Sequence, residues 1–113
     1  MSVAVLKRIQ CEGAVVPAIW HIEMANILGL KVRDGFLSQR ELEDALVLLQ
    51  LLDIVTDEVS PRLDHLLPLM AEYRLAAYDT IYLDLAKRKN IVLATFDKEM
   101  REAARRNGIM LAN

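Results

Sequence analysis

Apolar residues recur along this chain in two periods, one typical of helices and one typical of strands. In residues 18–30, side chains from Trp20 to Leu30 recur every three to four positions, which predicts a helix. Helical spacing also marks residues 3–11, 42–52, 78–89 and 98–106. Short runs with strand character stand between these segments, at residues 14–16, 53–57, 91–94 and 109–111.

Capping residues locate the ends of the predicted helices. Ser38 and Glu41 have the spacing of a capping box, which predicts a helix start at Ser38. Ser60 as the cap and Pro61 as the first helical residue predict another start. The residues expected to end helices are Gly13, Asp34–Gly35, Asn90 and Asn107–Gly108.

Strands that alternate with helices are expected to pair in parallel through right-handed crossovers. The predicted fold is therefore α/β, with three layers (α/β/α) and a mostly parallel sheet. We expect residues 1–113 to form one domain, because the chain has a suitable length and no repeat, low-complexity segment or linker.

Composition narrows the class of protein. With 54% hydrophobic and 27% charged residues, the chain is typical of a globular protein. The net charge of −2 gives no overall electrostatic case for nucleic acid binding. Two local clusters are basic, residues 87–89 and the set Arg101, Arg105 and Arg106. Last-turn cations are also favoured by the helix dipole, so phosphate steering and simple helix stabilisation both explain residues 87–89.

The cellular setting follows from what the sequence lacks. Cys11 is the only cysteine, which excludes an internal disulfide and a multi-cysteine zinc site. The longest apolar run, residues 45–52, is interrupted by Gln50 and is too short to span a bilayer. The N-terminus has no signal-peptide pattern. We expect a cytoplasmic protein without a membrane partner.

Three acids carry the most information about function. Glu23, Asp79 and Asp97 lie far apart in sequence, each among apolar or small residues. A carboxylate in such surroundings is costly unless it is paired. Two carboxylates about 4 Å apart repel by about 4 kcal/mol at an effective dielectric constant near 20, and a shared Mg²⁺ removes that repulsion. We therefore expect the three acids to converge at the carboxyl end of the sheet in a metal-dependent phosphodiesterase.

Each acid also has a plainer explanation. Asp97 is placed to cap the helix that follows it, and Asp79 lies in a first turn, where the helix dipole favours an anion. Glu23 is harder to explain this way, because its neighbours one turn away are apolar. His21 and His65 lack metal-ligand spacing and are weak candidates.

Three segments together resemble the PIN domain, and within that family the VapC-type toxins of toxin–antitoxin pairs. They are residues 16–26 (VPAIWHIEMAN), 77–86 (AYDTIYLDLA) and 94–97 (ATFD). The resemblance implies a Mg²⁺- or Mn²⁺-dependent endoribonuclease that acts on RNA, forms a homodimer and is held inactive by a cognate antitoxin. Glu23, Asp79 and Asp97 match the family's second, third and fourth acids, and Asn26 and Thr95 match polar residues that support them.

One departure from the family opens a second hypothesis. PIN domains normally begin with a central strand whose Asp-x-Ser pattern supplies the first metal ligand, and here no aspartate precedes Asp34. We expect this strand to be missing, through truncation, a mis-assigned start or true loss, and nuclease activity to be weak or absent. The alternative function is a catalytically weak or inactive PIN remnant that acts as an antitoxin-binding interaction module. A receiver domain is disfavoured, because its acidic pair after the first strand is absent.

Overall fold

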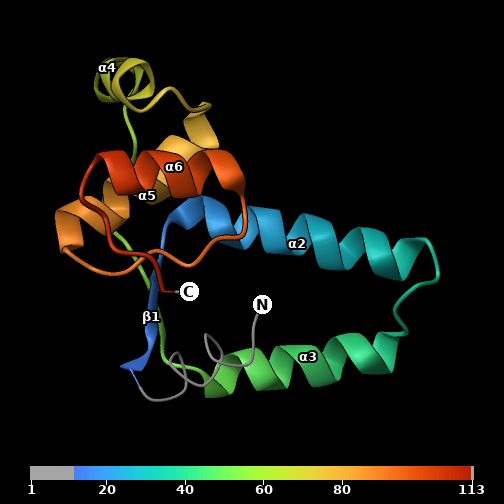
Figure 1. Ribbon diagram of the computed structural model, residues 1–113. Helices are drawn as coiled ribbons and strands as arrows, with labels where there is room; N and C mark the ends of the chain where they lie inside the picture. Colours follow the sequence, from blue (N-terminus) through green and yellow to red (C-terminus); the bar gives the residue numbers. More distant parts are fainter. Residues whose placement is uncertain (1–11, 113) are drawn as a thin grey trace. The chain divides into compact units, whose positions relative to one another are not determined.

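The computed structural model describes residues 12–112, and the predicted helix over residues 3–11 lies outside this range. The described chain divides into two compact units with the boundary between Asp57 and Glu58. Figure 1 shows the elements of both units. The single domain expected from the sequence remains a prediction.

Within residues 12–57, the unit before the boundary contains two strands and two helices. They are β1 (Ala14–Val16), α2 (Ala18–Arg33), α3 (Gln39–Leu51) and β2 (Ile54–Thr56). The strands pair in parallel, with Ala14 opposite Ile54 and Val16 opposite Thr56. Helices α2 and α3 form an antiparallel hairpin that connects β1 to β2 (Figure 1). The strands at 14–16 and 53–57 and the parallel pairing are thus confirmed, with β2 one residue shorter at each end.

Gly13 allows the two strands to approach each other at their amino ends. Its φ of +76° lies in the left-handed region, and a Cβ atom there would come within 2.7 Å of the carbonyl oxygen of Asp53. The next residue, Ala14, donates its backbone N–H to that same carbonyl at 2.8 Å. Any side chain at position 13 would therefore meet both backbone strain and a steric clash.

The start of α3 follows the sequence prediction. The hydroxyl of Ser38 accepts a hydrogen bond from the backbone N–H of Glu41 at 3.0 Å, and the Glu41 carboxylate accepts one from the N–H of Ser38 at 3.0 Å. These hydrogen bonds lower the pKa of Glu41. The capping box is confirmed, and it fixes the entry of the second helix of the hairpin.

The unit after the boundary contains three helices and the larger core. Helix α5 (Ala77–Lys89) contacts both α4 (Leu63–Tyr73) and α6 (Lys98–Arg106). Asn90 ends α5 in the left-handed conformation, and α6 has the predicted bounds. The core consists of buried side chains from all three helices and the segments that follow them: Tyr73, Leu75, Leu83, Ala86, Leu93, Met100, Ala103, Ala104 and Ile109.

Helix α4 begins later than the sequence predicts. Its first residue is Leu63 and its N-cap is Arg62, so Ser60 and Pro61 precede the helix instead of opening it. Pro68 lies inside α4 and cannot donate a hydrogen bond to the carbonyl of Asp64. The backbone of Arg62 is extended, with φ −112° and ψ 146°, so the helix can begin only after it.

The strands predicted at 91–94 and 109–111 are reduced to a single parallel bridge between Leu93 and Leu111. The N–H of Leu93 donates to the carbonyl of Met110 at 2.8 Å, and the N–H of Ala112 donates to the carbonyl of Leu93 at 2.9 Å. The two segments therefore lie side by side, but their pairing is too short to count as strands. Apolar runs alone overestimated their length.

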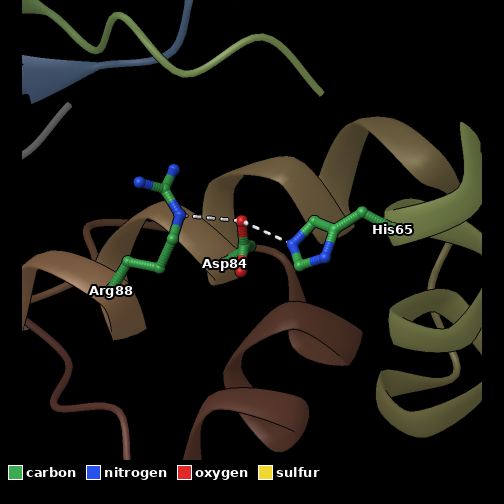
Figure 2. A network of polar contacts seen from close by, with 3 residues as sticks. All are labelled: His65, Asp84 and Arg88. Carbon is green, nitrogen blue, oxygen red and sulfur yellow. Dashed lines mark hydrogen bonds and ion pairs between the residues drawn. The ribbon is translucent and has the colours of Figure 1, made fainter. Parts of the chain in front are cut away.

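A cluster of three polar side chains ties α4 to α5 (Figure 2). The Asp84 carboxylate lies 2.9 Å from Nε of Arg88, one turn further along α5, and 3.6 Å from Nε2 of His65 on α4. Nearby, burial and the negative charges of Glu72 and Asp84 raise the pKa of Tyr73. The cluster gives His65 a polar partner on the neighbouring helix.

The described residues thus form a mixed α/β protein with parallel strand pairing, as predicted. Between residues 12 and 112, no helix has both the length and the apolar character needed to cross a membrane.

Candidate functional site

The backbone around Asp97 is held by hydrogen bonds within one short loop. Oδ1 of Asp97 accepts a hydrogen bond from the N–H of Met100 at 2.9 Å, so Asp97 is the N-cap of α6. Its own N–H donates to the hydroxyl of Thr95 at 3.1 Å. The capping role expected for Asp97 is therefore present. This role engages Oδ1 of Asp97 in a hydrogen bond and leaves the side chain exposed.

Arg101 braces the same loop from the first turns of α6. Its Nη1 donates to the carbonyl of Thr95 at 3.1 Å, and the Thr95 hydroxyl lies 3.8 Å from the sulfur of Met100. Thr95 therefore bonds through both its backbone and its side chain. The position of Asp97 depends on this small network rather than on the helix cap alone.

Asp79 lies in the first turn of α5, where the helix dipole favours a negative charge. Its side chain is half-buried. The next residue, Thr80, is fully buried and donates its hydroxyl to the carbonyl of Ala76 at 2.8 Å. Asp79 thus stands on a turn that is anchored in the core.

Glu23 and Asn26 lie on α2 in the other unit, three residues apart and on the same side of the helix. Glu23 is half-buried and Asn26 is exposed. The helix is linked to the sheet at its start, because Nε2 of His21 lies 2.8 Å from the hydroxyl of Thr56 at the end of β2. This contact makes His21 a structural residue.

The three acids are the right kind of ligand for Mg²⁺ or Mn²⁺, since carboxylates are hard oxygen donors. Within residues 12–112, no group of three histidine, cysteine, aspartate or glutamate side chains is arranged to hold a metal ion. Asp79 and Asp97 belong to one unit and Glu23 to the other. The convergence of all three therefore stays a prediction.

The structure also brings forward two residues that the sequence analysis did not single out. Asp57 directly follows β2 and is the one buried carboxylate in the described part of the chain. The sequence could have indicated Asp57, because it is an acid at the carboxyl end of a predicted strand, where functional groups of parallel sheets are commonly found. Phe96 lies between Thr95 and Asp97 with its ring exposed. Its signal is an aromatic residue next to a candidate acid.

Comparison with known families identifies the chain. The profile of the PIN domain matches residues 2–106, a range that includes Glu23, Asp79 and Asp97. The chain belongs to the PIN-domain family. PIN domains are generally nucleases.

Among solved structures, the chain is similar to the crystal structure of PAE2754 from Pyrobaculum aerophilum. The TM-score is 0.61 at 24% sequence identity, and the similarity covers 87% of this chain. The chain spans 65% of the length of that protein. This likeness shows the PIN fold alone. A search of curated proteins found no match.

Proposed function

We propose that this PIN domain is a metal-dependent endoribonuclease with Glu23, Asp79 and Asp97 as its catalytic carboxylates. The observation that carries the proposal is the PIN-domain match over residues 2–106, which includes all three acids. Asp97 is held by a braced loop and Asp79 by an anchored helical turn. Such fixed positions suit residues that must keep a set geometry.

Mg²⁺ or Mn²⁺ is the cofactor that these acids would hold, and the ion would activate water and stabilise charge on the scissile phosphate. The chain's own residues contribute orientation. Thr95 positions Asp97 through the hydrogen bond to its N–H, and Asn26 lies on the same side of α2 as Glu23. The three carboxylates would give the site its negative charge.

We further propose the setting of a VapC-type toxin, in the cytoplasm, with a cognate antitoxin and a homodimeric assembly. Support comes from the resemblance of the three sequence segments and from exposed apolar side chains on α3. Val47, Leu48 and Leu51 are exposed there, and contiguous apolar surface of this kind is a feature of interfaces.

The second candidate is an inactive PIN remnant that binds antitoxin. The observation that favours it is the exposed apolar surface of α3, which suits a binding surface. Under this hypothesis the same α3 surface would serve binding, and the acids would have only structural roles.

The decisive experiment compares cleavage of single-stranded RNA with Mg²⁺ or Mn²⁺ and with EDTA. We expect weak cleavage that requires metal and is lost in Asp79→Asn. Asp64→Asn is the control, because it removes an exposed carboxylate from α4 in the same unit. Cleavage that survives chelation would contradict the metal mechanism, and equal losses in both variants would contradict the role of Asp79.

The same experiment separates the two candidates. If no cleavage occurs with either metal, while the protein still binds antitoxin, the inactive-remnant hypothesis is favoured. Restoration of activity by an upstream extension that supplies the Asp-x-Ser strand would instead support the nuclease.

A further inference from the structure

Two aromatic side chains stand next to the candidate acids and point into solvent. Phe96 directly precedes Asp97 and is 68% exposed, and Tyr78 directly precedes Asp79 and is 59% exposed. The chain has six aromatic residues, and only one other, Phe36, is comparably exposed. Two of the three most exposed aromatic side chains in residues 12–112 thus belong to the short segments that carry acids.

The exposed ring of Phe96 is displayed by a fixed backbone. The residues on either side of it are linked by the hydrogen bond from the Asp97 N–H to the Thr95 hydroxyl. Arg101 holds the Thr95 carbonyl, and Met100 holds the Asp97 carboxylate. A loop held in this way cannot readily fold the ring onto the core. Phe96 therefore remains available to a ligand.

Tyr78 is displayed in a similar way. It lies in the first turn of α5, and the buried Thr80 anchors that turn through its hydrogen bond to the Ala76 carbonyl. Its ring faces solvent although Tyr73, a few residues earlier, is buried in the core. Both aromatic residues belong to the same unit of the structure.

Cations accompany the aromatic residue on the loop. Lys98 follows Asp97 and is exposed, and Arg101 places its guanidinium against the loop. An exposed ring on a segment that also carries cations fits one ligand class in particular. Nucleobases stack on aromatic rings, and the phosphates that link them are attracted to lysine and arginine.

We propose that Phe96, assisted by Tyr78, is a stacking residue that binds unpaired bases of single-stranded RNA beside the candidate acids. The proposal deepens the ribonuclease function proposed above, on which it rests. It selects single strands because the bases of a duplex already cover each other's faces, whereas unpaired bases are free to stack on a side chain. A protein partner is disfavoured, because single exposed rings between polar residues do not form a contiguous apolar patch.

The test measures binding of a short, unstructured, fluorescently labelled oligoribonucleotide by anisotropy in EDTA, where no metal-dependent cleavage occurs. We expect Phe96→Ala to weaken binding about tenfold and Tyr78→Ala to weaken it several-fold. Phe96→Trp should retain the affinity, because it keeps an aromatic face. Phe36→Ala is the matched control, since it removes an even more exposed phenyl ring (80%) from the turn between α2 and α3, and it should bind like the wild type.

Several results would overturn the proposal. Two concern the variants: wild-type affinity in Phe96→Ala, or full affinity in Phe96→Leu, whose side chain is apolar but has no aromatic face. Two concern the wild type: equal affinity for duplex and single-stranded RNA, or no binding of RNA at all. Thermal melting of each variant checks that the fold is intact. Loss of binding in Phe96→Ala without any cleavage by the wild type would support stacking and count against the nuclease, so the two proposals fail separately.

Discussion

At the scale of single residues, Asp97 shows that a structural and a proposed catalytic role can share one side chain. Its carboxylate caps α6 through the N–H of Met100, and its N–H is held by Thr95. The two explanations that the sequence left open for Asp97 are therefore compatible. A variant that keeps the cap and removes the charge can separate them.

Asp97→Asn and Asp97→Ala provide this separation. Asparagine caps a helix about as well as aspartate does, whereas alanine at an N-cap costs about 1 kcal/mol. We expect Asp97→Asn to unfold at the same urea concentration as the wild type and Asp97→Ala to unfold at a lower one. Both should lose RNA cleavage if the carboxylate is catalytic. Wild-type cleavage by Asp97→Asn would restrict Asp97 to its capping role.

At the scale of elements, the contact of α4 with α5 combines a buried tyrosine with a polar cluster. Tyr73, the last residue of α4, is buried in the core, while His65 near the start of the helix lies against Asp84. Burial and, to a smaller extent, the charges of Glu72 and Asp84 raise the pKa of Tyr73. Because of this raised pKa, the stability that Tyr73 contributes to the fold depends on pH in the alkaline range.

The sign of the pH dependence follows from the raised pKa. An unfolded tyrosine loses its proton near pH 10, whereas Tyr73 in the folded protein loses it only at higher pH. Stability contributed by the neutral phenol is fully present below about pH 10 and is lost as the pH rises through the folded-state pKa. We expect the wild type to lose stability above pH 10 more steeply than Tyr73→Phe in urea unfolding. Equal slopes would contradict this link.

At the scale of the whole molecule, apolar surface is distributed unevenly between the two units. The larger core lies after the boundary at Asp57, and helices α2 and α3 contain no buried residue. The apolar side chains of α3, its C-cap and α4 differ in exposure: Leu46, Leu63 and Leu67 are exposed, while Leu42, Leu49, Leu52, Leu66 and Met70 are half-buried. Val47, Leu48 and Leu51 on α3 are also exposed and are candidates for the proposed homodimer interface.

The homodimer proposal predicts a mass of about twice 12.8 kDa in light scattering at micromolar concentration. We expect Leu48→Glu to shift the protein toward the monomer, because a carboxylate in an apolar interface is desolvated without a partner. Gln50→Glu adds the same charge to an exposed polar position of the same helix and should leave the mass unchanged. A wild type that is monomeric under these conditions would refute the dimer.

What the sequence determined is mainly local. The capping box of Ser38 and Glu41, the stop at Asn90 and the bounds of α6 depend on side chains within a turn or two of one another, so the residues themselves specify them. The family was also readable, because its acids lie in short segments whose neighbours are distinctive. The order of helices and parallel strands followed from the alternation of two periods.

Tertiary structure decided the features that need a distant partner. An apolar run such as 91–94 becomes a strand only as far as another segment pairs with it, and here the pairing is a single bridge. Leucine spacing likewise did not distinguish the exposed Leu46 from side chains that are covered, because burial depends on what packs opposite. Nor did the sequence show that Phe96 would be held in solvent, since that depends on the bonds of Thr95 and Arg101 around it. Periodicity in the sequence determines which face of a helix or strand is apolar. Only the tertiary structure determines which other segment packs against that face.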